Sequence, residues 1–189
     1  MTLLKSLSMY RGKQTIFTMP EISSLTDQYY GQKLYSALKY AIKSKNLIRV
    51  SRGIYAFNGS YSRQELANKY RTPSYISLYT IFQEAGIVFQ PYESIYAVSN
   101  RCQTIVIDRQ KYIYRKIKDE FLLNPFGILL KDRVNKASPE RALCDKIYLD
   151  GDEYFDNLRQ IDWSLLKTIN RTVYRNNQII NEFIRKNKK

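Results

Sequence analysis

Histidine is absent from the 189-residue chain, and there are only two cysteines, Cys102 and Cys144. Without imidazole, the chain cannot form a Ser-His-Asp or Cys-His catalytic arrangement or a histidine metal site. Two cysteines are too few to bind zinc on their own. We therefore expect no metal, no cofactor and no catalytic residues of these kinds, and we expect both thiols to be reduced and buried.

Long apolar runs are also missing. No stretch approaches the roughly 20 consecutive apolar residues that cross a bilayer, and no signal-peptide pattern opens the chain. The sequence therefore predicts a cytoplasmic protein with no membrane partner, a compartment in which free thiols are usual.

Acidic residues are scarce relative to basic ones, with 17 Asp and Glu against 31 Lys and Arg and a formal net charge of +14. Such an excess favours polyanionic partners, of which nucleic acid is the commonest. The excess is uneven: residues 1–72 hold 12 basic and 3 acidic residues (net +9), and residues 73–189 hold 19 and 14 (net +5). We therefore expect the DNA-binding segment in the first third of the chain.

The first 58 residues show a sequence of short elements. Leucines near the start predict a helix, and residues 16–17 an extended segment. Thr18 ahead of Pro20 and Glu21 is typical of a capped helix start, with a turn over 26–31. Apolar residues at 34, 37, 38, 41 and 42 form one stripe of a helix over 32–45. Residues 47–50 and 54–57 predict a hairpin around Ser51-Arg52-Gly53. This order is that of a winged helix-turn-helix.

The helix over 32–45 and the hairpin carry the candidate DNA-binding residues. A recognition helix buries one face and presents hydrogen-bonding and positive side chains to the major groove. The first turns predict base contacts, the later lysines phosphate contacts, and Arg52 a contact from the hairpin tip with the backbone or a minor groove. The predicted DNA-binding residues are Gln32, Lys33, Ser36, Lys39, Lys43, Lys45, Arg49 and Arg52.

The region from 59 to 189 predicts a second domain of mixed α/β type, so the whole chain is assigned to the α+β class. Its predicted strands are 87–89, 94–98, 104–107 and 112–116. Its predicted helices are 62–70, 74–84, 138–148, 162–173 and 178–184, with an apolar stretch at 121–130 left ambiguous.

Two groups of carboxylates invite other interpretations. Glu140 and Asp145 are five residues apart and do not share a helix face, and Arg141 with Asp145 has the spacing of a surface ion pair. An enzyme acting on nucleic acid would need a metal-binding carboxylate cluster. The dense candidates for one are Asp150, Asp152, Glu153 and Asp156, although no calcium-loop spacing follows them.

Three segments resemble the AbiEi antitoxins. Residues 47–55 (LIRVSRGIY) resemble the wing of that family, 73–78 (PSYISL) the start of its second domain, and 137–145 (ASPERALCD) its later S-x-E-(K/R)-A-L-x-D helix. The three occur in the family's order and span most of the chain. The resemblance places Lys33, Ser36 and Lys39 on the recognition helix and Arg52 on the wing.

The resemblance implies an antitoxin of a type IV toxin–antitoxin system, linked to abortive infection by phage. A winged helix over residues 1–58 would repress the operon's own promoter through inverted repeats in double-stranded DNA. A domain over 59–189 would counteract a nucleotidyltransferase toxin without needing a stable complex with it. The alternative is a plain winged-helix transcriptional regulator whose second domain binds a ligand or another protein.

Overall fold

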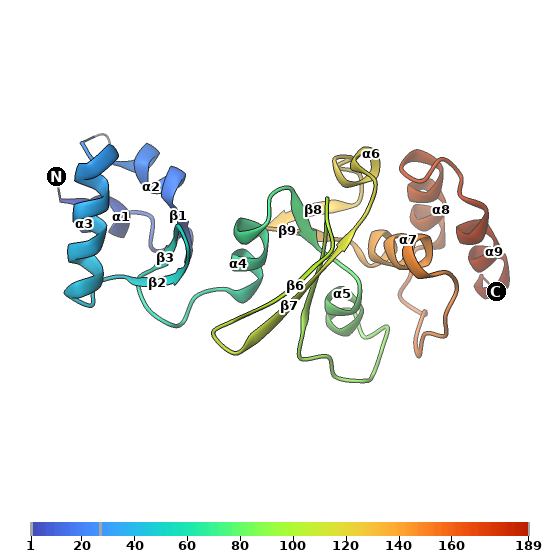
Figure 1. Cartoon of the computed structure of the whole chain (residues 1–189). Helices are drawn as coiled ribbons and strands as arrows, with labels where there is room; N and C mark the ends of the chain where they lie inside the picture. Colours follow the sequence, from blue (N-terminus) through green and yellow to red (C-terminus); the bar gives the residue numbers. More distant parts are fainter. Residues whose placement is uncertain (1, 27, 189) are drawn as a thin grey trace. The chain divides into compact units, whose positions relative to one another are not determined.

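The computed structural model describes residues 2–26 and 28–188, and it contains two compact units, Met1–Tyr70 and Arg71–Lys189 (Figure 1). The first, here the N-terminal unit, extends past residue 58 to include helix α4 (Arg63–Tyr70). This helix is held there because the buried Glu65 carboxylate accepts hydrogen bonds from Thr15 N (2.9 Å) and Thr15 Oγ1. The helix is therefore part of the first unit.

The N-terminal unit contains helices and a small antiparallel sheet in the predicted order. Its strands pair as β1-β3-β2, with β2 and β3 forming the hairpin. Leucines of α1 and α3 pack with Phe17 and Ile22 in one core. Before α4, the elements are α1 (Leu3–Ser8), β1 (Phe17–Thr18), α2 (Met19–Leu25), α3 (Gly31–Lys43), β2 (Ile48–Ser51) and β3 (Ile54–Ala56).

The start of α2 confirms the predicted cap. Thr18 Oγ1 accepts a hydrogen bond from Glu21 N, and Glu21 Oε2 accepts one from Thr18 N at 2.7 Å. This capping box satisfies backbone donors at both positions. The predicted turn over 26–31 includes Asp27, which lies outside the described residues.

The second unit, here the C-terminal unit, is built on a six-stranded mixed sheet, so the α+β class is confirmed. The strand order is β6-β7-β5-β4-β9-β8, in which β5/β7 and β4/β9 are parallel pairs and the other neighbours are antiparallel. The strands are β4 (Ser74–Ile76), β5 (Ile95–Ser99), β6 (Gln103–Ile107), β7 (Gln110–Lys116), β8 (Ile128–Lys131) and β9 (Val134–Ala137).

Strand β8 lies at one edge of this sheet and pairs with β9 alone. Its side chains are largely uncovered: Leu129 is 61% exposed and Leu130 is 73% exposed. Lys131 is the strand's charged residue, and Asp132-Arg133, both at positive φ, turns the chain into β9. The edge therefore combines apolar side chains with accessible backbone.

Helix α7 is the central helix of the C-terminal unit. It contacts α5, β9, α8 and α9, and residues 140–147 are all buried, as expected for a helix surrounded by protein. The five helices are α5 (Tyr79–Glu84), α6 (Asp119–Leu122), α7 (Pro139–Asp150), α8 (Trp163–Thr172) and α9 (Gln178–Asn187).

Several predictions for this unit were wrong. The helix over 74–84 is strand β4 followed by α5, because β4 lies between β5 and β9 and Leu78 (φ 56°) interrupts the helical backbone. Residues 87–89 form no strand. The ambiguous stretch 121–130 contributes to α6 and β8. Cys144 is buried, which raises the pKa of its thiol well above the usual value, but Cys102 is exposed.

Candidate nucleic-acid interface

Helix α3 is fixed to the N-terminal unit by one apolar side. Leu34, Leu38 and Ala41 are buried, and Ala37 and Ile42 are partly buried against the same core. The predicted stripe is therefore the packed side of the helix, and the opposite side is accessible.

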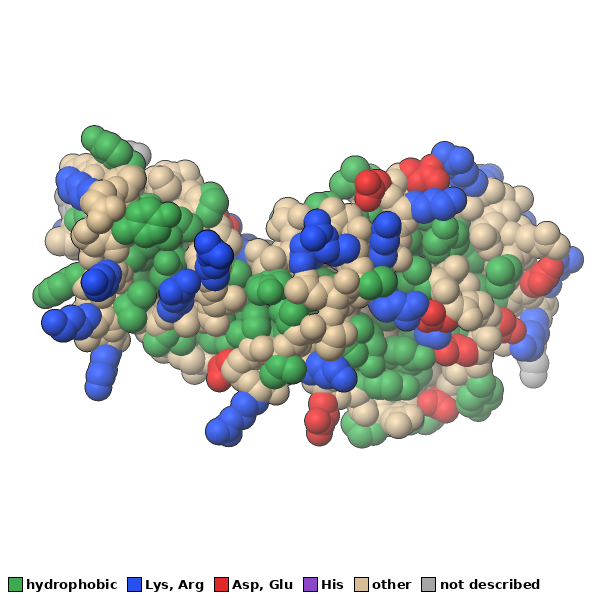
Figure 2. All heavy atoms as spheres, in the orientation of Figure 1, with side chains coloured by type: hydrophobic (Ala, Val, Ile, Leu, Met, Phe, Trp, Pro, Cys, Tyr) green, Lys and Arg blue, Asp and Glu red, His purple; other side chains and the backbone are tan. Residues whose placement is uncertain are grey.

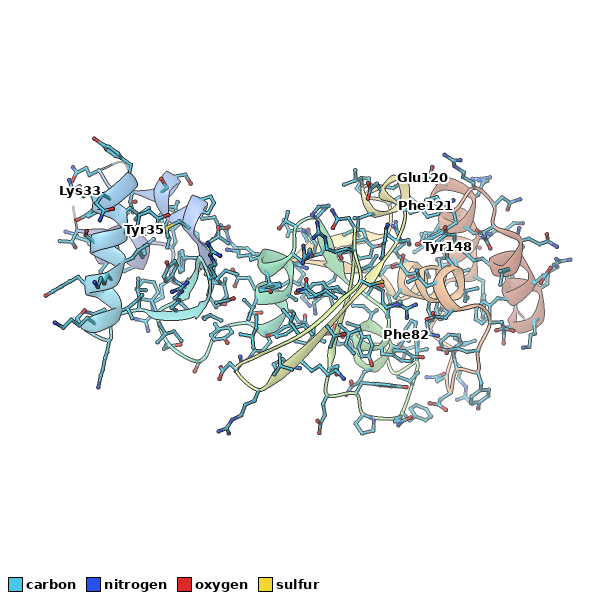
Figure 3. The ribbon with its side chains drawn as sticks, in the orientation of Figure 1. Lys33, Tyr35, Phe82, Glu120, Phe121 and Tyr148 are labelled. Carbon is cyan, nitrogen blue, oxygen red and sulfur yellow. The ribbon has the colours of Figure 1, made fainter. Side chains whose placement is uncertain are left out.

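All eight predicted DNA-binding residues are exposed. Figure 2 shows Lys and Arg side chains projecting from the α3 side of the unit, and Figure 3 places Lys33 and Tyr35 in the N-terminal half of the helix. Helical geometry puts four of the five α3 candidates opposite the buried stripe and Lys33 beside them. The five candidates that α3 brings together are Gln32, Lys33, Ser36, Lys39 and Lys43.

The other three candidates lie outside that face. Arg49 is in β2, with Nε 3.4 Å from the Ser51 carbonyl oxygen. Arg52 is in the two-residue turn, which needs Gly53 at φ 73°. Lys45 follows the helix at φ 58° and lines a hollow with residues of α1, so it is separated from the α3 face.

Three exposed tyrosines lie at the start of α3 and along it. Tyr30, Tyr35 and Tyr40 are 73%, 59% and 71% exposed. Tyr29, by contrast, packs on the core. Tyr35 and Tyr40 flank the polar α3 face on its two sides, a position that the spacing from Leu34 and Leu38 already indicated. Aromatic rings therefore border the cationic face.

Acidic side chains do not neutralise this face among the described residues. Glu21 and Glu65 both bind Lys69 of α4, with Nζ–Oε1 distances of 2.8 and 3.2 Å. Burial would raise the pKa of Glu21, but Lys69 and the Thr18 N–H together lower it below its usual value. Both carboxylates are therefore occupied by Lys69, and the described parts of the unit show no ion pair at the α3 lysines.

The N-terminus of α3 adds positive potential to the same face. Tyr30 is its N-cap and gives no side-chain hydrogen bond, unlike Thr18 at the start of α2. In a helix without a side-chain cap, the first backbone N–H groups have no acceptor within the helix. Together with the helix dipole, they favour an anion at the N-terminus.

In the C-terminal unit, the predicted surface ion pair between Arg141 and Asp145 is buried instead. Both side chains are 0% exposed, and Arg141 Nε lies 3.4 Å from Asp145 Oδ1. The i,i+4 spacing correctly placed them together, but Tyr75 of β4, Phe121 of α6 and Tyr174 after α8 cover that side of α7. The guanidinium also donates to the carbonyl oxygens of Phe121 (2.6 Å) and Phe126 (2.8 Å) and to Tyr75 OH (3.0 Å).

Asp145 is the common acceptor of this buried cluster. It accepts hydrogen bonds from Tyr75 OH (2.9 Å), Ser77 Oγ (2.7 Å) and Tyr174 OH. Burial raises its pKa above the usual value, against the opposing effects of Arg141 and the three hydroxyls. Phe121 and Tyr148 pack beside the cluster at 5.1 Å between ring centroids (Figure 3). The arrangement joins β4, α6, α7 and the end of α8, and Asp145 is inaccessible to a substrate.

The acidic segment that begins at the last residue of α7 does not assemble a metal site among residues 2–26 and 28–188, where no suitable group of three ligands occurs. Its carboxylates have protein partners instead: Asp150 binds Arg115 (2.6 Å), Asp152 binds Lys186 (2.7 Å), and Glu153 binds Lys146 (2.7 Å). The Arg115 hydrogen bond lowers the pKa of Asp150 below its usual value. Asp156 Oδ2 accepts from Phe89 N at 2.8 Å.

In the described parts of the chain, no helix combines the length and apolar character needed to cross a membrane. No family model matches the sequence, and no curated protein matches it either.

Proposed function

We propose that this chain is a double-stranded-DNA-binding repressor whose N-terminal unit is a winged helix-turn-helix. The observation that carries the proposal is the accessible face of α3, where Gln32, Ser36 and three lysines are exposed opposite a packed apolar side. Recognition helices require that division between a buried face and a face available to the major groove.

The order of elements supports the same assignment. Helix α2 precedes α3, and the β2–β3 hairpin follows it and pairs with β1. The hairpin turn lies beside the start of α2, because Met19 N donates to the Gly53 carbonyl oxygen at 2.8 Å. Arg52 in this turn is the candidate for a backbone or minor-groove contact.

The expected role of each residue in DNA binding follows from its position along α3. Gln32 and Ser36 carry donors and acceptors suited to base edges, and Lys33 lies near them at the helix start. Lys39 and Lys43, further along, suit phosphates. The exposed rings of Tyr35 and Tyr40 supply apolar surface for sugars or thymine methyl groups at the sides of this face.

The resemblance to AbiEi antitoxins extends the proposal to the C-terminal unit. In this proposal the N-terminal unit represses the promoter of its own operon, and the C-terminal unit counteracts a nucleotidyltransferase toxin. Co-expression with a nucleotidyltransferase encoded by an adjacent reading frame tests it: rescue of growth is expected. Repression of the promoter without rescue would instead favour a plain transcriptional regulator.

A Gln32→Ala variant is expected to lose discrimination between DNA from its own promoter and a random duplex. A lost bidentate base contact costs roughly 1–3 kcal/mol on the correct sequence and little elsewhere. Competition binding with both duplexes measures the ratio of the two affinities. Equal weakening on the two duplexes would show that Gln32 does not read a base.

A Lys39→Ala variant is expected to bind both duplexes more weakly by the same factor. Removing one phosphate contact should reduce the slope of log K against log salt by roughly one unit. Titrations at several salt concentrations measure this slope, with Lys111→Ala, an exposed lysine of β7, as the control. An unchanged slope for Lys39→Ala would exclude a phosphate contact.

A further inference from the structure

A second basic site lies in the N-terminal unit, away from the α3 face. A hollow of about 480 Å³ is bordered by α1, the residues after α3 and Phe57. Its described lining residues include three cations and no carboxylate. Its lining residues are Leu4, Lys5, Ser8, Arg11, Lys45, Asn46 and Phe57.

A smaller hollow of about 170 Å³ adjoins the first and shares Arg11 and Phe57 with it. The Arg11 guanidinium carbon lies over the Phe57 ring, 5.2 Å from its centroid, and both residues line both hollows. This cation–π contact restrains a long side chain that would otherwise be free at the surface.

Gln14 lines the smaller hollow and is 5% exposed. Its Nε2 has no hydrogen-bond partner among the described residues. A buried amide donor without an acceptor is costly, and such groups in folded proteins call for a specific explanation. A ligand that brings an acceptor to Gln14 would satisfy it.

We propose that these two hollows form one binding site for an organic phosphate. The phosphate group is held by Lys5, Arg11 and Lys45, and the remainder of the ligand places a hydrogen-bond acceptor against Gln14. Three cations that line one hollow, with no carboxylate among its described lining residues, suit a phosphate dianion. The concave shape and the buried amide favour a small molecule over the convex backbone of a duplex. The site is independent of the proposed DNA-binding function.

Calorimetric titration of the full chain, without DNA, tests the site. Pyrophosphate and the four common nucleoside diphosphates are the probes. Pyrophosphate and at least one nucleoside diphosphate are expected to bind. The Arg11→Gln substitution is expected to lower the affinity for both about tenfold, as for loss of a charged hydrogen bond. Lys13→Gln is the matched control, since Lys13 is exposed in the same segment but does not line the hollow.

A Gln14→Leu variant separates the two parts of the site. It should lower the affinity for the nucleoside diphosphate and leave the affinity for pyrophosphate unchanged. An unchanged affinity for the nucleoside diphosphate overturns the role of Gln14. Thermal melting of each variant checks folding. Absence of binding by every probe overturns the proposal, as does binding that Arg11→Gln and Lys45→Gln leave intact. If these two variants lower DNA affinity while no probe binds, the cations belong to the duplex contact surface and the proposal fails.

Discussion

An Arg141→Ala variant is expected to lower the free energy of unfolding of the C-terminal unit by roughly 3–5 kcal/mol, the usual cost of breaking a buried ion pair. The substitution leaves the Asp145 carboxyl, which is 0% exposed, without its cationic partner. It also removes the guanidinium that donates hydrogen bonds to the carbonyl oxygens of Phe121 and Phe126, so that these two acceptors lose their partner. A unit of this size has little stability to spare, so the variant should be largely unfolded at 37 °C.

Urea denaturation followed by tryptophan fluorescence measures this loss. Trp163, in α8, is the single tryptophan, so the signal reports the C-terminal unit. Lys186→Ala is the control: its pair with Asp152 is exposed (68% for Lys186), and surface pairs contribute roughly 0–1 kcal/mol.

The matching double variant, Arg141→Met with Asp145→Leu, should cost less than the two single changes together, because it leaves no unpaired charge. Additive losses would mean that the two side chains contribute independently. A loss for Arg141→Ala as small as that of the surface control would contradict the buried pair.

The second large effect is expected on DNA binding. Replacing Lys33, Lys39 and Lys43 together with alanine should weaken binding to any duplex and reduce the salt slope by about 2.7 units, if each lysine neutralises one phosphate. The protein should still fold, since all three side chains are exposed. Fluorescence anisotropy over a range of salt concentrations measures both quantities.

The matched control removes the same charge from the C-terminal unit. Lys167, Arg185 and Lys188 lie around one hollow at α8 and α9 and form no ion pair among the described residues. Their triple alanine variant should keep most of the affinity and the slope. Equal loss in both triple variants would mean that net charge, rather than the α3 face, drives binding.

The N-terminal unit could be predicted closely because its signals are local. The stripe around Leu34 and Leu38 defines α3, Thr18 with Glu21 defines the start of α2, and Gly53 marks the hairpin turn. Each depends on residues only a few positions apart, and the eight candidate residues are exposed as that pattern requires.

The C-terminal unit could not be predicted as well, because its elements are decided by distant residues. Tyr75 and Ser77 bind Asp145, about seventy positions away, and β4 forms between strands that follow it in the chain. Helix spacing placed Arg141 beside Asp145, but it contains no information on which other elements cover that side. The Gln14 hollow likewise depends on residues after β3, and no local pattern indicates it.

The edge strand β8 has a consequence for the protein in concentrated solution. Two uncovered leucines and a row of backbone groups without a neighbouring strand form a template onto which another chain can add by strand pairing. Lys131, at the end of the strand, opposes this addition, because a lysine on an edge strand discourages pairing with a second copy. Self-association of the protein should therefore begin at β8, and its onset should depend on salt, because ions screen the charges that keep two such edges apart.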